Sequence, residues 1–283
     1  MPTKTKVRNM FDSIAGDYDS LNHILSLDVD KIWRKKALKQ IVDAPAPARV
    51  LDLACGTGDF SIAIAKALSR SHKRVGTPLE AHAKASVKAP VEAPAKAPVE
   101  AQVTSTGFVT GDSGRSDLMT KGHVTGVDLS EGMLAVMREK VAKAGLTEMI
   151  SIEEGDGENL RFPDNTFDRV TIAFGIRNFE NREKGLREML RVLKPGGRLV
   201  ILELSRPENK IIRWFYDLYF LHILPKIGGK VSGDKAAYAY LPASVAAFPG
   251  KKEFSATMRE AGFRTVTHKA FTLGICRMYT GEK

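Results

Sequence analysis

The fold is decided by the sequence Leu51-Asp52-Leu53-Ala54-Cys55-Gly56-Thr57-Gly58-Asp59, in which a short apolar strand runs into a glycine turn and a helix begins at Asp59. Such a turn brings bare backbone against a ligand at the N-terminus of the helix. A dinucleotide site needs a third glycine three residues after the second, and Ser61 stands there. Carboxylates on both sides of the turn would also repel a pyrophosphate. We therefore expect a cationic ligand such as S-adenosylmethionine, held by Asp52, Gly56, Thr57 and Gly58.

Strands and helices alternate on both sides of this turn. The alternation predicts a doubly wound α/β sheet, mostly parallel and covered by helices on both faces. The last two strands are joined by a short link, which favours an antiparallel edge. The expected strands are residues 49–54, 123–128, 150–154, 169–174, 198–203, 263–268 and 274–279. The expected helices are residues 59–69, 131–143, 183–193 and 252–261, and Lys194-Pro195-Gly196-Gly197 is expected to end the third of them.

A segment from about residue 72 to residue 121 does not share this pattern. It contains an imperfect eight-residue repeat, KAPVEAPA at 88–95 and KAPVEA at 96–101. Proline about every four residues excludes a helix, and the segment has too few apolar side chains to offset the entropy of ordering it. We expect a disordered Ala/Pro/Lys-rich insertion in the domain. A docking tether is the alternative role for it.

Two acids follow the later strands and complete a nucleoside site. A nucleoside ligand needs a carboxylate about 20 residues after the glycine turn to accept its ribose hydroxyls. Asp128 lies 70 residues after Gly58, and removing the insertion restores the spacing. Asp156 would accept a hydrogen bond from an adenine amino group, with the Gly157 amide near the ring. The alternatives are that Asp128 caps the next helix and that Asp156 stabilises a turn.

The composition bounds the class of protein. The 283 residues carry a formal net charge of +10, which fits nucleic acid, an anionic membrane surface or a solvated basic surface. Cys55 and Cys276 have no metal or redox spacing, so we expect no metal and a reducing compartment. The N-terminus has no apolar signal core, and the sequence has no run of about 18 apolar residues. We therefore expect a cytoplasmic protein without a membrane span.

Several stretches outside the insertion share the pattern of one known family. They are YDSLNHILS at 18–26 with Trp33, the turn at 51–59, FPDNTFD at 162–168, FGIRN at 174–178, RVLKPGG at 191–197, ELS at 203–205, YAYLPAS at 238–244 and FP at 248–249. They resemble the ubiquinone/menaquinone biosynthesis C-methyltransferases, a class I S-adenosylmethionine-dependent family. The resemblance implies an N-terminal helical lid at 1–45 and a Rossmann-like methyltransferase domain at 46–283. It also implies S-adenosylmethionine binding by Thr57, Asp128, Asp156 and Gly157.

Three positions depart from the family pattern. Ala173 stands where the family often has a serine that contacts the cofactor. Leu21 and Asp30 stand where it usually has a methionine and a histidine. We therefore assign no role to these three positions.

The resemblance implies transfer of a methyl group to a ring carbon of a polyprenylated quinol, and we expect conversion of demethylmenaquinol to menaquinol. The equivalent step of ubiquinone biosynthesis, or both steps, is the alternative. A ring carbon becomes nucleophilic when the neighbouring hydroxyl loses its proton, so the site needs a base and an oxyanion stabiliser. Arg177 and Asn178 are the candidates to hold the quinol oxygen. Asp19 and His23 are the candidate bases.

An apolar substrate tail requires contact with a membrane. The aromatic-rich segment 211–226 is too charged to span a bilayer. It is expected either to lie at the membrane surface or to line a groove for the prenyl tail, so that the protein is peripheral at the inner face of the membrane. A buried lid helix is the alternative.

Two other functions fit part of the sequence. A nucleic-acid methyltransferase fits the basic charge, but the amino-methylating types usually carry Asn/Asp-Pro-Pro-aromatic after the fourth strand, where this chain has Gly-Ile-Arg-Asn. We therefore expect no nucleic-acid partner. A non-catalytic binding module is the second alternative. The intact set of Asp52, Gly56, Gly58 and Asp128 argues against a lost cofactor site.

Overall fold

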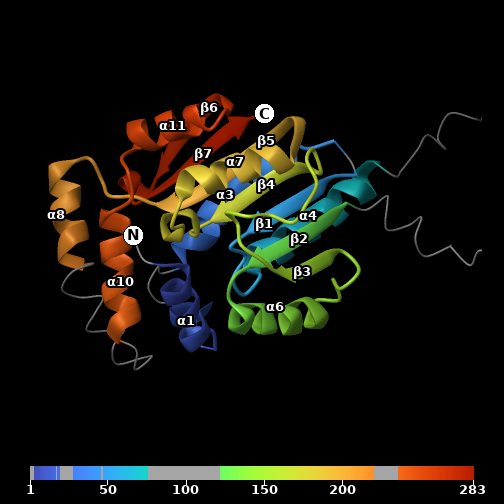
Figure 1. The fold of residues 1–283 in the computed structure, drawn as a ribbon, viewed down its shortest axis with the longest axis horizontal. Coiled ribbons are helices and arrows are strands. Elements are labelled where there is room, and N and C mark those ends of the chain that lie inside the picture. The colour runs from blue at the N-terminus through green and yellow to red at the C-terminus, as the bar shows by residue number, and fades with distance from the viewer. Residues whose placement is uncertain (1–2, 17, 20–27, 46, 76–121, 220–234) are drawn as a thin grey trace, which may run out of the picture.

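The computed structural model describes residues 3–16, 18–19, 28–45, 47–75, 122–219 and 235–283. Seven strands form one sheet: β1 (Arg49–Leu53), β2 (His123–Asp128), β3 (Ile150–Glu154), β4 (Phe167–Ala173), β5 (Leu193–Leu204), β6 (Arg264–Phe271) and β7 (Cys276–Glu282). Their order across the sheet is β3-β2-β1-β4-β5-β7-β6 (Figure 1). The strand order reverses between β1 and β4, and this is where α/β sheets of this kind bind ligands.

Helices cover both faces of the sheet. On one face α3 (Val29–Ile41), α4 (Asp59–Val75) and α6 (Glu131–Lys143) contribute to one apolar core. On the other face α7 (Arg182–Val192) and α11 (Lys251–Glu260) contribute to a second. When helices cover both faces of a parallel sheet, the side chains that point to either face of a strand are buried. In β1, Val50 lies in the first core and Leu51 in the second.

The predicted fold class is confirmed. The expected β2, α6 and β3 agree with the structure to the residue. The first five strands pair in parallel, and β7 pairs antiparallel with both β5 and β6. The antiparallel part therefore comprises β6 and β7, and β7, the last strand of the chain, lies between β5 and β6.

Helix α7 ends at Val192, as the expected stop at Lys194-Pro195-Gly196-Gly197 predicts, but these four residues belong to β5. The ladder between β4 and β5 shifts register here, from Phe167 opposite Leu193 to Arg169 opposite Arg198. Gly196 has φ +74°, which permits the bulge. The Lys283 amide donates to the Gly197 carbonyl at 3.0 Å, so the end of the chain extends the pairing.

The helices that precede β1 differ in where they pack, and the helix that follows β1 is longer than expected. α1 (Lys4–Ile14) lies near α6, whereas α3 packs into the core through Trp33, Ala37 and Ile41. α4 runs to Val75, so it is longer than expected and takes in the first residues assigned to the insertion. The rest of the insertion lies outside the described residues.

Two further helices stand at one side of the molecule (Figure 1). They are α8 (Lys210–Leu218) and α10 (Lys235–Ala246). On α8, Trp214 and Phe215 are 61% and 60% exposed, and Ile211 and Leu218 are exposed beside them. The described half of the expected 211–226 segment is therefore not a buried helix. None of the helices in the described ranges combines the length and the hydrophobicity needed to cross a bilayer.

Candidate active site

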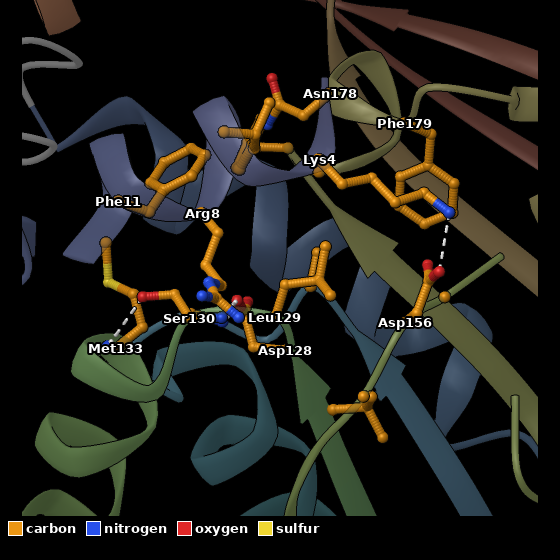
Figure 2. A pocket seen from close by; sticks show the side chains of 18 of the residues that line it. Lys4, Arg8, Phe11, Asp128, Leu129, Ser130, Met133, Asp156, Asn178 and Phe179 are labelled. Carbon is orange, nitrogen blue, oxygen red and sulfur yellow. Dashed lines mark hydrogen bonds and ion pairs between the residues drawn. The ribbon is translucent and has the colours of Figure 1, made fainter. Parts of the chain in front are cut away.

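A cleft opens at the carboxyl ends of the central strands. It encloses about 750 Å³ between its walls, its open mouth included. Its floor includes Gly56 and Asp128, and one side carries Asp156 and Gly157. Figure 2 shows α1 crossing above this floor, with Arg8 directed toward the loop that holds Asp128 and Ser130. The cleft is therefore built from strand ends far apart in the sequence and roofed by the N-terminal helix.

The glycine turn forms the floor of the cleft. Gly56 and Gly58 have φ +56° and +83°, a region that favours glycine. A Cβ on Gly58 would clash with the Met137 side chain of α6. The Gly56 amide donates a 2.8 Å hydrogen bond to Oδ2 of Asp128. The structure thus brings Asp128 beside the turn, as the spacing predicts once the insertion is removed.

Asp128 stabilises the loop between β2 and α6. Its Oδ1 accepts a 2.9 Å hydrogen bond from the Ser130 amide. The helix cap itself is Ser130, whose hydroxyl accepts from the Met133 amide at 3.2 Å, so capping does not explain the acid. Burial raises the pKa of the Asp128 carboxyl, although the amide hydrogen bonds oppose this rise. A neighbouring cation or hydroxyl donor would favour its ionised form.

Asp52 lies beneath the turn and is buried. The alternation of β1 directs it to the face of α4, where the Ser61 hydroxyl donates to it at 2.6 Å. Burial raises the pKa of Asp52 to about 7, and the Ser61 hydrogen bond only partly offsets it. A cationic ligand beside this carboxyl would restore its ionisation at neutral pH.

Asp156 holds both a turn and an ion pair. Its Oδ1 accepts from the Glu158 amide at 2.9 Å, which is the turn arrangement named as the alternative. Its Oδ2 is paired at 2.7 Å with Lys4 Nζ of α1, and Figure 2 shows this contact at the edge of the cleft. Lys4 also pairs with buried Glu158 at 2.9 Å. A Cβ on Gly157 would lie 2.6 Å from the Phe179 ring, so this glycine lets the ring approach the backbone.

A smaller pocket adjoins the cleft on the far side of the turn. Tyr18, Ala54, Gly56 and Ala173 line both spaces, and Thr57 lines only the smaller one. The Thr57 hydroxyl donates to Asp19 at 2.5 Å.

Asp19 is therefore held in place rather than open to the cleft. Besides the Thr57 hydrogen bond, it pairs with Lys140 Nζ at 2.6 Å. This anchors the N-terminal segment to the glycine turn. The other candidate base, His23, lies outside the described residues.

The two residues expected to hold a quinol oxygen follow β4 in a 3-10 turn, η1 (Ile176–Asn178). Arg177 is buried and faces inward, where Nη1 pairs with Glu203 Oε1 at 2.9 Å and Nε donates to Ser244 at 3.3 Å. Burial alone would lower the pKa of Arg177, but the Glu203 carboxylate raises it. Asn178 lines the cleft.

Asn178 is oriented by a residue of α10. The Tyr240 hydroxyl donates to Asn178 Oδ1 at 2.9 Å. Burial raises the pKa of Tyr240, so this hydroxyl keeps its proton near neutral pH. With its oxygen occupied, the Asn178 amide nitrogen is the group left to donate to a ligand.

Sequence reasoning missed the cations around the cleft, namely Lys4, Arg8, Arg34 and Lys140. Their only signal in the sequence is a basic residue on a predicted helix, which normally marks a solvated face. The described residues contain no group of three or more His, Cys, Asp or Glu side chains arranged to hold a metal ion. The absence of a metal remains a prediction.

Comparison with known proteins identifies the family. A sequence model described as the ubiE/COQ5 methyltransferase family matches residues 2–283. The chain belongs to this family.

Its relatives include a Geobacter sulfurreducens protein named ubiquinone/menaquinone biosynthesis C-methyltransferase UbiE, which is 42% identical over 98% of this chain and 88% of its own length. Proteins named demethylmenaquinone methyltransferase are 40% identical in Deinococcus radiodurans and 37% identical in Bacteroides fragilis. Each match covers 98% of this chain and 92% of the relative. The resemblance noted from the motifs is thereby confirmed, and the chain is an enzyme of the methyltransferase class.

Solved structures agree on the fold. The [4+2]-cyclase SpnF aligns with a TM-score of 0.62 at 16% identity, covering 100% of this chain and 97% of its own. A Thermotoga maritima protein described as an S-adenosylmethionine-dependent methyltransferase, possible histamine N-methyltransferase, aligns with a TM-score of 0.54 at 17% identity, covering 97% and 99%. At these identities the likeness concerns the fold alone.

The donor set of the site suits S-adenosylmethionine, the methyl donor of this class of fold. Asp52, which is buried, and Asp128, which is half-buried, flank the glycine turn, and desolvation raises the pKa of each carboxyl. A ligand with a sulfonium and an ammonium supplies the positive charge that stabilises both carboxylates. The bare backbone of Gly56 allows the close approach that such a ligand needs.

Proposed function

We propose that this enzyme methylates a ring carbon of demethylmenaquinol to give menaquinol, with S-adenosylmethionine as the methyl donor. The equivalent step of ubiquinone biosynthesis is the alternative substrate choice. The observation that carries the proposal is identity of 37–42%, over nearly the whole chain, to relatives with these names. The cleft at the carboxyl ends of β1 to β4 supports it.

The donor would lie across the glycine turn. Asp128 would accept hydrogen bonds from the ribose hydroxyls; its carboxylate beside Gly56 at the cleft floor supports this. Asp156 and the Gly157 amide would bind the adenine end. Asp52, Thr57 and Gly58 are at the methionyl end, where the smaller pocket adjoins. When bound, the donor supplies an electrophilic methyl group on a positively charged sulfur.

The residues after β4 would bind the oxygen of the quinol. Asn178 lines the cleft, and its amide nitrogen donates to the oxygen as negative charge develops. Arg177 lies behind it with its charge satisfied by Glu203. We infer that Arg177 acts mainly by holding the turn in shape.

The proton of the quinol hydroxyl requires an acceptor near the cleft. Asp19 and His23 remain the candidates from the N-terminal segment. Asp19 would first have to exchange its contact with Lys140 or Thr57. Substituting Asp19→Asn and His23→Gln separately, and comparing the pH dependence of kcat, distinguishes the two.

The location of the protein would be cytoplasmic, with peripheral contact at the inner face of the membrane. On α8, Ile211, Trp214, Phe215 and Leu218 are spaced at i, i+3, i+4 and i+7 and share one exposed face. An exposed apolar helix face with aromatic residues is typical of a segment that lies in the membrane surface. It would bring the cleft to the lipid layer that holds the prenyl tail.

The test is a methyl-transfer assay with the purified protein. The reaction contains labelled S-adenosylmethionine and a short-chain demethylmenaquinol kept reduced, and the product is identified by mass spectrometry. Parallel reactions contain the ubiquinone precursor and RNA. Methylation of a quinol carbon supports the proposal, whereas methylation of RNA without quinol turnover would refute it.

A further inference from the structure

The smaller pocket contains a cation to which the proposed function assigns no role. Arg34 of α3 lines this pocket together with Asp52, Gly56 and Asp59. Its side chain is only 17% exposed. Since the two spaces share Tyr18, Ala54, Gly56 and Ala173, a ligand that crosses the glycine turn reaches Arg34 at its methionyl end.

The Arg34 guanidinium retains donors that its present partners do not use. Among the described residues its hydrogen bond goes from Nη1 to Asp59 Oδ2 at 3.3 Å, and Nη2 lies 3.8 Å from Asp30 Oδ2. Nε is buried and has no hydrogen-bond partner in the part of the chain that the structure describes. A guanidinium carries five donors, and its optimal carboxylate contacts are near 2.8 Å. The distances from Arg34 to Asp59 and Asp30 are therefore longer than those of a guanidinium in optimal contact with a carboxylate.

The guanidinium is also fixed in orientation. It lies 5.7 Å from the centre of the Phe174 ring, and Trp33 on the same helix is anchored to Thr272 by a 2.8 Å hydrogen bond. An arginine held in this way forms a forked contact with a carboxylate at low entropic cost.

We propose that Arg34 binds the α-carboxylate of the methionyl group of S-adenosylmethionine. This inference rests on the proposed function. The methionyl group carries one ammonium and one carboxylate, and the smaller pocket presents acids and a guanidinium together. Asp52 and Asp59 face the ammonium, and Arg34 faces the carboxylate.

The surrounding acids do not prevent a carboxylate from binding. Lys140 pairs with both Asp19 and Asp59 and so neutralises part of their charge. The ligand brings its own ammonium to the same pocket. Arg34 can then direct its unused donors to the ligand and keep Asp30 and Asp59 as supports.

The experiment measures binding of three ligands by calorimetry. They are S-adenosylmethionine, its decarboxylated analogue, which lacks only the α-carboxylate, and methylthioadenosine, which lacks the whole amino-acid end. The proteins are the wild type, Arg34→Met and Arg34→Lys. Lys35→Met is the matched control, because Lys35 is the next residue of α3 and is exposed.

We expect the preference for S-adenosylmethionine over the decarboxylated analogue to fall about tenfold to hundredfold in Arg34→Met, the value of a hydrogen-bonded charge pair. Lys35→Met should keep the wild-type preference, and methylthioadenosine should bind equally to all four proteins. An unchanged preference in an Arg34→Met protein that still binds methylthioadenosine would overturn the inference and leave the proposed function intact.

Two further outcomes are distinguishable from these. If Arg34→Met binds none of the ligands, the Arg34→Lys protein decides. Lysine keeps the positive charge but cannot make the forked contact of a guanidinium. The preference of Arg34→Lys for S-adenosylmethionine over the decarboxylated analogue should therefore fall by at least about threefold. An unchanged preference refutes the inference. If the wild type itself binds none of the ligands, the proposed function fails together with the inference.

Discussion

Replacing Arg177 by methionine should destabilise the protein strongly, because Arg177 neutralises a fully buried carboxylate. Glu203 has no exposed surface, and Arg177 Nη1 lies 2.9 Å from its Oε1. The guanidinium also donates to the Ser244 hydroxyl and to the carbonyl of Phe174. One substitution therefore leaves a charge without its counter-ion and loosens the turn that presents Asn178.

The expected loss follows from what remains around Glu203. Removing one partner of a buried ion pair typically costs about 3–5 kcal/mol. Two donors stay in place, the Leu204 amide at 2.8 Å and the Arg177 amide at 3.1 Å. We therefore expect a value near the lower end, about 3 kcal/mol. This is a large part of the roughly 5–15 kcal/mol that stabilises a typical domain.

Urea denaturation of four proteins tests this reasoning. They are the wild type, Arg177→Met, Glu203→Leu and the double variant, and the free energy of unfolding is extrapolated for each. Because the double variant has no unpaired charge, it should recover much of the stability lost in Arg177→Met. A loss below about 1 kcal/mol in Arg177→Met would refute the account. So would a double variant with the summed losses of the single ones, because that would mean the pair is not coupled.

Three other perturbations have defined outcomes. Since burial raises the pKa of Asp52 from 3.8 to about 7, the wild type loses stability as pH rises through this window. The free energy of unfolding of Asp52→Asn should therefore rise relative to that of the wild type by roughly 2–3 kcal/mol between pH 5 and pH 8 in urea denaturation, and parallel pH curves would exclude this cause. Asp128→Asn should weaken binding of S-adenosylmethionine about tenfold or more in calorimetry, and unchanged affinity would remove this acid from the site. Replacing both Trp214 and Phe215 by serine should abolish co-sedimentation with anionic liposomes, whereas Ile32→Ser, an exposed apolar change on another helix, should not. Equal sedimentation of all three proteins would count against the membrane contact.

The sheet was predictable from the sequence because parallel strands buried on both faces are continuous apolar runs between turn residues. Residues 199–202 illustrate this, because Leu-Val-Ile-Leu is an unbroken apolar run and all four side chains are buried in β5. The Lys194–Gly197 stretch was not predictable by the same rule. Proline and two glycines signal a helix stop, but pairing with the end of the chain adds a bulged extension to β5. Such tertiary pairing has no local signal.

The positions of the acids that line the cleft were predictable from strand ends, and those of the cations were not. Asp128 and Asp156 follow directly from the rule that ligands meet the carboxyl ends of the strands. Lys4 and Arg34 reach the same place from helices outside the strand pattern, and sequence spacing does not fix where such helices dock. The position of Arg177 after the fourth strand was predictable, but the direction of its side chain was not. That direction depends on Glu203, which is 26 residues away.

The pairing of Lys4 with Asp156 bears on how the adenine end of S-adenosylmethionine would bind under the helix α1. Lys4 Nζ donates to Oδ2 of Asp156, an oxygen of the carboxylate that the proposed function offers to an adenine amino group. S-adenosylmethionine and Lys4 of α1 therefore compete for Asp156 unless Lys4 has a second partner. Glu158 is such a partner at 2.9 Å and is also anchored by the Glu180 and Asn181 amides. Lys4 can thus release Asp156 and keep one ion pair, at a cost of about 1 kcal/mol or less for a contact that is partly exposed. By this reasoning α1 stays in place as a roof while its lysine moves from two carboxylates to one.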